Sequence, residues 1–570
     1  MTGSASSTLP LDLRRSAAIG LAFGAGAVHL AVVGVLLMLN QRAIIVGSLT
    51  LGQATLLLIA AGAGLMAARA ERLGEGLFAG MVAGAVASLP LSALTVLIGF
   101  VSLRSIFIAL SPELLAMLTC GQGLTKGVII LIGCGAIAGL IGAGLRRCPA
   151  LPRRAAIVGL AAVAVGGVFQ ELIQAILQQY EGVIGEIRDF LYTWEGLTPQ
   201  GAAACFGVAA FSGGFAGFLS QRRAAQGLVP DRRRQRLIKA GVALLALALL
   251  PAVAGSYIGQ VLMLVGLYIL MGMGLNLEIG LAGLLDLGFV AFFAVGAYTT
   301  ALLTADSPHA LAHLSYWAAM PISVVLAVLI GVLFGLPVLG VRGDYLAVAT
   351  LGLGEIVSVI VMSDFAAPLL GGAQGILQIP KPVLGRFTLG SPVSLFYLTL
   401  VCSGVAAFVA WRLENSRLGR AWMALRDDED VAQALGINLV RSKLLSYGLG
   451  AAFAGLAGSI FATMLTSVYP SSFQLLISVN VVALLIVGGM GSLPGVVIGA
   501  LALIGLPELL REFGEYRYLF YGAVLIVMMR LRPEGLWPSD VRRRELHASD
   551  EALALDDAGG VLAPAGDGTD

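Results

Sequence analysis

Residues 412–443 read RLENSRLGRAWMALRDDEDVAQALGINLVRSK, a strongly charged segment between two long apolar runs. Four consecutive acidic residues at 427–430 place negative charge where a helix begins, and Gly436 is a residue at which helices commonly end. Apolar residues recur at three- or four-residue spacing, which predicts two short helices with one apolar face each. This face comprises Trp422, Leu425, Val431, Ala432 and Leu435. We interpret the segment as a cytoplasmic loop that docks into a cleft of a soluble partner, and an ordinary ordered loop is the alternative.

The composition is that of a polytopic membrane protein. Apolar residues make up 58% of the chain and charged residues 12%, and the mean hydropathy is +0.93. A soluble domain does not carry so apolar a composition. The five Cys residues have no paired spacing, so we expect neither a disulfide framework nor a metal site. We expect no cofactor either.

The first half of the chain predicts a membrane domain over residues 16–220. Its apolar runs, about six spans by length, fall near 16–39, 43–68, 76–101, 126–145, 154–179 and 201–220. Arg residues gather at alternate ends of these runs, which by the positive-inside rule places both ends of the domain in the cytoplasm. Residues 1–15 are therefore a cytoplasmic N-terminus.

Residues 221–239, QRRAAQGLVPDRRRQRLIK, form a basic linker to a second membrane domain over 240–538. We expect about ten spans there, near 237–253, 257–276, 280–304, 316–340, 344–363, 393–412, 444–466, 475–490, 494–510 and 516–531. The tail at 539–570 is polar enough to be disordered and is expected to be cytoplasmic. The predicted fold is an all-α polytopic bundle.

Several motifs in the second domain occur in a recognisable order. They are GLNLEIGLAGLLDLGFVAFFAVGAYTTALL at 274–303, VRGDYLA at 341–347, TLGLGEI at 350–356, GGAQGI at 371–376, GAAFAGLAG at 450–458, GGMGS at 488–492 and RPEGL at 532–536. Over about 257–538, roughly half of the chain, this series resembles the permease subunits of branched-chain amino-acid ABC importers.

The resemblance implies a transport subunit of the bacterial inner membrane. It would work with a sister permease, two cytoplasmic ATPases and a periplasmic binding protein. Asp430, Val431, Ala432 and Gly436 resemble the Glu-Ala-Ala…Gly motif through which such permeases meet their ATPases, with Asp in place of Glu and Val in place of Ala. We therefore name residues 412–443 the coupling loop. The chain has no phosphate-binding loop ending in Gly-Lys-Ser or Gly-Lys-Thr, so we expect it not to be an enzyme.

The substrate is expected to be a branched-chain or related amino acid, and urea or a short amide is the alternative. A secondary transporter is a further alternative that would need no large coupling loop. Asp286 and Glu355 are candidate pathway residues, since a charge in hydrocarbon is costly unless it faces protein or water. Either could instead make a helix-packing hydrogen bond or pair with Arg342.

Three interpretations of the first 230 residues stay open. They form an accessory membrane domain, a diverged sister permease fused to this one, or a domain that recruits another protein. LTLGQA at 49–54 faintly echoes LDLG at 285–288, which favours fusion. The basic connection at 146–154 is too short for a coupling helix, so we expect a separate sister permease.

Overall fold

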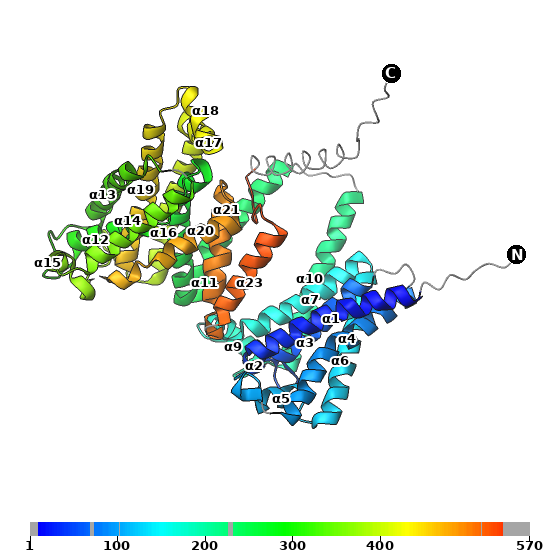
Figure 1. The fold of residues 1–570 in the computed structure, drawn as a ribbon. Coiled ribbons are helices and arrows are strands. Elements are labelled where there is room, and N and C mark those ends of the chain that lie inside the picture. Colours follow the sequence, from blue (N-terminus) through cyan, green and yellow to red (C-terminus); the bar gives the residue numbers. More distant parts are fainter. Residues whose placement is uncertain are drawn as a thin grey trace, which may run out of the picture. The chain divides into compact units, whose positions relative to one another are not determined.

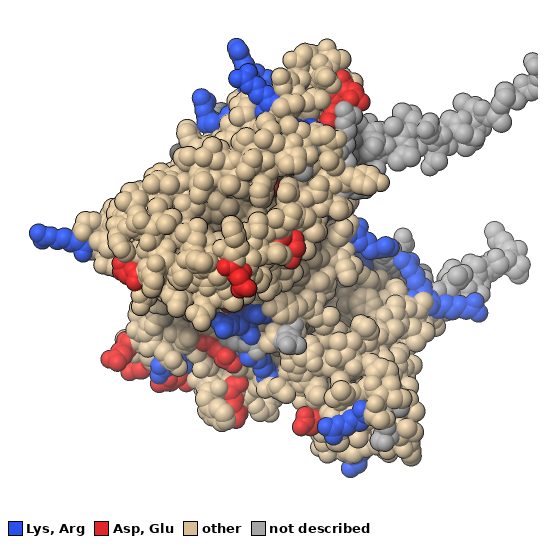
Figure 2. All heavy atoms as spheres, turned by 60° about the vertical axis from the view of Figure 1, so that its left-hand side comes forward, with Lys and Arg blue, Asp and Glu red and all other residues tan. Residues whose placement is uncertain are grey.

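The computed structural model describes residues 9–68, 73–101, 103–225, 232–341, 343–514 and 516–539. The chain consists of two compact units, Met1–Ala240 and Gly241–Asp570. Within the described residues, eleven helices are long and apolar enough to cross a membrane, and three shorter apolar helices accompany them. Most of the surface in view in Figure 2 carries no charged side chain, as expected for a surface that faces lipid. The predicted all-α polytopic fold is confirmed.

The first unit is a helical bundle (Figure 1), to which one small sheet is added. Its helices are α1 (Leu9–Val33), α2 (Val35–Asn40), α3 (Leu51–Ala67), α4 (Leu73–Phe100), α5 (Pro112–Leu118), α6 (Leu124–Arg147), α7 (Ala150–Val168), α8 (Gln170–Leu177), α9 (Val183–Leu191) and α10 (Pro199–Ala225), with a 3₁₀ turn η1 (Leu103–Ser105). The strands, in the order β2-β1-β4-β3, are β1 (Ala43–Ile45), β2 (Leu49–Thr50), β3 (Tyr192–Thr193) and β4 (Gly196–Leu197).

Small residues hold this bundle together. A methyl group on Gly64 of α3 would overlap the backbone of Gly139 on α6, and one on Gly84 of α4 would overlap the carbonyl of Gly135. Helices in lipid associate through such close backbone approach, because burial of apolar side chains between helices contributes little free energy there.

The predicted span at 43–68 is wrong at its start, because residues 43–50 form β1 and β2. Thr50 accepts a hydrogen bond from the Gln53 N–H at 3.2 Å, and the Gln53 side chain accepts one from the Thr50 N–H at 3.2 Å. This capping box fixes the start of α3 at Leu51. β1 also pairs with β4 from far along the chain, a long-range contact that local apolar composition does not reveal.

The second unit contains the remaining elements (Figure 1). Its helices are α11 (Arg232–Leu275, beginning before the unit boundary), α12 (Val290–Thr304), α13 (Tyr316–Val338), α14 (Asp344–Met362), α15 (Ala367–Leu370), α16 (Pro392–Glu414), α17 (Arg417–Asp427), α18 (Glu429–Ala434), α19 (Leu439–Leu465), α20 (Leu475–Gly488), α21 (Leu493–Ala500), α22 (Leu506–Leu509) and α23 (Tyr516–Leu531). Two π-helical segments are η2 (Asn276–Leu281) and η5 (Leu501–Gly505), and 3₁₀ turns are η3 (Gly372–Gln374), η4 (Pro470–Ser472) and η6 (Arg511–Phe513). The strands are β5 (Ile376–Leu377) paired with β8 (Ser467–Val468), and β6 (Val383–Leu384) paired with β7 (Phe387–Thr388).

Helix α19 is the centre of the second unit, since α12 and α13 both pack along it. Gly296 of α12 lies against the backbone of Gly455, and Gly458 lies against the carbonyl of Phe293. Within α11 the chain breaks at Gly255, whose φ of +84° suits only glycine. This break separates the two spans predicted at 237–253 and 257–276.

The predicted span at 280–304 is also wrong at its start. The π-helix η2 ends at Leu281, and the chain is irregular until α12 begins at Val290. Gly283 has a φ of +73°, which stops the helix. A methyl group on Gly288 would overlap the carbonyl of Thr350, so α14 packs directly onto this stretch. We name residues 276–289 the broken segment.

Candidate coupling and transport sites

The coupling loop consists of two capped helices, as the sequence predicts. The Ser416 hydroxyl accepts hydrogen bonds from the N–H groups of Leu418 and Gly419 at the start of α17. Asp428 Oδ1 accepts from the N–H groups of Asp430 at 2.8 Å and Val431 at 2.9 Å at the start of α18. After α18, Gly436 takes the left-handed conformation with a φ of +88°. Local sequence signals therefore fix the course of this loop.

The predicted apolar face of the loop is divided in two by the fold. Trp422, Leu425 and Ala432 are 0%, 2% and 1% exposed, so they pack inside the chain. Val431 and Leu435 are 54% and 75% exposed. Of these five apolar residues, Val431 and Leu435 alone are thus free to contact a partner. Asp430 is exposed beside them.

Buried polar contacts fix the loop to α19. Trp422 Nε1 donates to the Ser442 carbonyl at 2.9 Å, and Lys443 Nζ lies 2.7 Å from Glu429 Oε1. A cleft with an empty space of ≈ 800 Å³, counting its open mouth, runs beside this ion pair between the end of α13 and α18. Its lining includes Leu339 and Gln433. The coupling loop is therefore held firmly against the start of α19.

Arg426 connects the coupling loop to the broken segment. Its Nη1 donates to the Gly280 carbonyl at 3.0 Å, and a methyl group on Gly283 would overlap the Arg426 side chain. A displacement of α17 would therefore act directly on residues 280–283 through these contacts.

Asp286 lies in the broken segment, before α12 begins at Val290. It is 1% exposed, and its Oδ1 accepts the Gly288 N–H at 2.7 Å. The Leu287 N–H donates to the Thr350 hydroxyl at 3.0 Å, which joins the segment to α14. Arg342, the pairing partner considered from the sequence, lies outside the described residues.

Glu278 was missed by the sequence analysis, although it is an acidic residue within an apolar run. It lies in η2 and is 0% exposed. The signal that could have found it is the same one that singled out Asp286, the cost of a charge in hydrocarbon.

Glu355 has a different environment. It is exposed on α14, and no described residue forms a hydrogen bond or ion pair with it. Tyr345, Val348, Ile356 and Val359 of the same helix are also exposed. The structure therefore does not bring Glu355 and Asp286 into one site.

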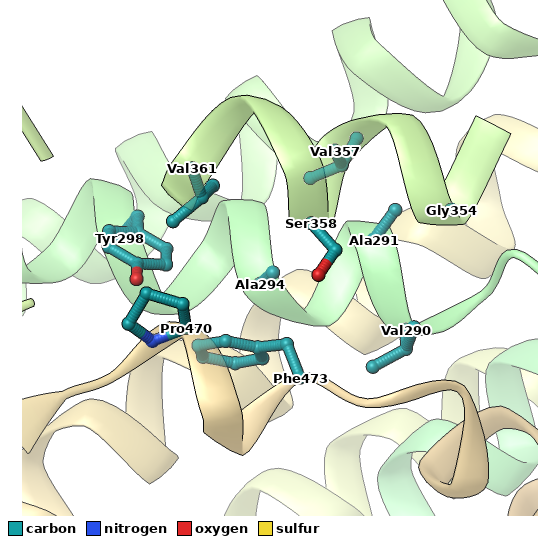
Figure 3. Close-up of a pocket in the computed structure, with 10 residues that line it drawn as sticks. All are labelled: Val290, Ala291, Ala294, Tyr298, Gly354, Val357, Ser358, Val361, Pro470 and Phe473. Carbon is teal, nitrogen blue, oxygen red and sulfur yellow. The ribbon is translucent and has the colours of Figure 1, made fainter. Parts of the chain in front are cut away.

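A small cavity lies between α12 and α14, next to η4 (Figure 3). Its empty space is ≈ 260 Å³, counting its open mouth, and its lining is mostly apolar, with Val290, Ala294 and Phe473 among the wall residues. Figure 3 shows Ser358 on α14 facing α12. The Tyr298 hydroxyl has no hydrogen-bond partner among the described residues. The enclosed part of this space has room for about one water molecule.

In the described part of the chain, no three His, Cys, Asp or Glu side chains gather in one place. The fold and the sites together define a polytopic helical membrane protein with a polar loop anchored to α19.

Comparisons with known proteins identify the family. The family model described as branched-chain amino acid transport system, permease component, matches residues 257–529. The LivM permease protein of the Escherichia coli K12 high-affinity branched-chain amino acid transport system is 40% identical, over 51% of this chain and 78% of LivM. LivM of Salmonella typhimurium is 39% identical, over 48% of this chain and 68% of its own. E. coli LivH, another permease protein of that system, is 25% identical, over 47% of this chain and 90% of LivH. No solved structure matches.

This chain belongs to the family of branched-chain amino acid transport system permease components. The resemblance inferred from the ordered motifs is confirmed. The matched region lies wholly within the second unit.

Proposed function

We propose that this chain is the permease subunit of a bacterial ABC importer for branched-chain or related amino acids. It forms part of the translocation pathway in the inner membrane and carries no ATPase activity of its own. Both termini, the basic linker and the coupling loop lie on the cytoplasmic side. The exposed pair Val431 and Leu435, held beside Gly436 on a capped and anchored loop, carries this proposal.

The partners follow from the same reasoning. Two permease proteins named LivM and LivH are similar to this chain, which supports a sister permease of the same family. Two cytoplasmic ATPases would receive the coupling loops, and a periplasmic binding protein would deliver the substrate. ATP binding would favour one arrangement of the ATPases, and the loop would transmit that preference to the membrane helices.

The relatives support the substrate class. The permease proteins LivM and LivH, which are similar to this chain, belong by name to high-affinity branched-chain amino acid transport systems. We therefore favour an amino acid over urea or a short amide.

Uptake by the assembled system in lipid vesicles tests the function. The full chain, the sister permease, the ATPases and the binding protein are reconstituted, and uptake of labelled leucine is followed with and without ATP. We expect ATP-dependent uptake that excess isoleucine or valine suppresses and excess urea does not. Uptake driven by an ion gradient without the ATPases would instead identify a secondary transporter, and uptake of urea would establish the alternative substrate.

A further inference from the structure

Two carboxyl groups are buried side by side in the broken segment. Glu278 is 0% exposed and Asp286 is 1% exposed. Their carboxyl groups lie close enough for their charges to interact. Two negative charges this close, away from water, repel strongly, so the pair is not stable with both groups ionised.

No hydrogen bond from the surrounding described residues reaches Glu278. Neither of its carboxyl oxygens accepts a hydrogen bond from another described group, and Asp286 Oδ2 also has no donor. Gly450 of α19 lies so close that a methyl group there would overlap Glu278 Oε1. That side of the carboxyl therefore has no room for a water molecule or a hydrated ion.

The charged groups on the neighbouring helices are engaged elsewhere. Arg426 of α17 donates to the Gly280 carbonyl at 3.0 Å and lies 3.6 Å from Asp427. Lys443 of α19 pairs with Glu429 at 2.7 Å. Tyr447 of α19 is the further titratable group that faces the pair, and its hydroxyl has no partner among the described residues. From α14 the nearby side chain is Thr350, which does not titrate. Neither Arg426 nor Lys443 forms an ion pair with Glu278 or Asp286 among the contacts of the described residues.

The two carboxyls differ in the donors that reach them. Asp286 Oδ1 accepts the Gly288 N–H at 2.7 Å. This hydrogen bond favours the charged form of Asp286. Glu278 has no such donor, but as an acid it could donate its own O–H to the free Asp286 Oδ2, which would satisfy both groups.

We propose that Glu278 and Asp286 form a proton-binding site, in which Glu278 carries the proton and donates it to the Asp286 carboxylate. The site stabilises the folded course of the broken segment. In this segment the Gly280 carbonyl accepts a hydrogen bond from Arg426 of the coupling loop, and the segment continues into α12, which lines the cavity. Loss of the proton would leave two negative charges that repel each other within the broken segment.

Infrared spectroscopy of the purified full chain in sodium-free buffer at pH 7.5 tests the site. A protonated carboxylic acid gives a carbonyl band that carboxylates lack. We expect this band in the wild type and in Glu113→Gln, a matched change of an exposed acid on α5, and its loss in Glu278→Gln. Absence of the band in the wild type would overturn the proposal, as would its disappearance when sodium is added, since the site would then hold a cation.

Denaturant unfolding gives a second measurement. Unfolding exposes Glu278 to water, where it loses its proton above about pH 5. The wild-type unfolding constant should therefore rise with pH above about pH 5, relative to that of Glu278→Gln, which has no proton to release, and the rise is at most about tenfold per pH unit. The Gln amide keeps a donor for Asp286, so this variant should fold. Equal slopes for the two proteins would contradict the proposal.

Asp286→Asn provides a further test that does not depend on Glu278→Gln folding. The acceptor of the Glu278 proton changes in this variant, so we expect the carbonyl band to shift in frequency but remain. An unshifted band would show that the proton is not shared with Asp286.

Discussion

Glu355 is an acidic side chain that α14 leaves exposed in this chain. Because no described residue contacts its carboxyl through a hydrogen bond or ion pair, Glu355→Gln should not disturb the fold of the chain. We expect it to reduce the maximal uptake rate while leaving co-purification with the sister permease intact. Glu355→Leu should reduce both if the carboxyl is buried against that subunit. Unchanged transport kinetics of a well-expressed Gln variant would remove Glu355 from the pathway.

Gly436 is held at a φ of +88° with nothing within 4 Å of where a side chain would begin. Gly436→Val should therefore cost roughly 1 kcal/mol or more through backbone strain alone. We expect normal membrane insertion and loss of the ATP hydrolysis that binding protein and substrate stimulate in the reconstituted complex. Gly404→Val is the matched control, since Gly404 also faces open space but has an ordinary φ. Full stimulation of Gly436→Val would show that this turn does not matter for coupling.

Variants at Leu435 and Ala432 distinguish an effect on docking of the coupling loop from an effect on its folding. Leu435 is exposed, so Leu435→Glu should leave the loop folded and abolish stimulated ATP hydrolysis by placing a charge in an apolar contact. Ala432→Glu, which the sequence alone would suggest as an equivalent probe, would bury a charge inside the chain and destabilise the loop itself. The two variants should therefore differ in resistance of the loop to proteolysis. If both hydrolyse ATP at the full stimulated rate, this loop is not the coupling site.

The elements differ in how far the sequence reveals them. Helices α17 and α18 follow from caps at Ser416 and Asp428 and a stop at Gly436, all of which act within a few residues. The broken segment does not follow from local signals, because its course depends on Thr350 and Gly450 packing from distant helices. For the same reason the sequence showed an apolar face on the loop but not that Trp422 is turned inward to bond Ser442. Contacts over long sequence distances decide both features.

The two units of the chain have separate compact cores, and only the second carries the family match. In the first unit, just two residues connect α6 to α7, so this connection cannot form a loop like α17 and α18. The described part of the first unit thus favours an accessory domain over a fused sister permease that docks its own ATPase. Its role stays a prediction.

Removal of the first unit tests this interpretation. A chain that starts at Arg232, the first residue of α11, retains every element of the second unit and the whole of the family match. Because Gly296, Gly455 and the other close helix contacts of this unit lie within it, the shortened chain should insert into the membrane and co-purify with the ATPases. Western blotting of membranes and affinity purification measure the two steps, with Leu435→Glu in the shortened chain as the control that should insert but not co-purify. If the shortened chain reaches normal amounts yet fails to bind the ATPases, the first unit is an integral part of the permease, because its loss would then have changed a docking surface more than two hundred residues away in the sequence.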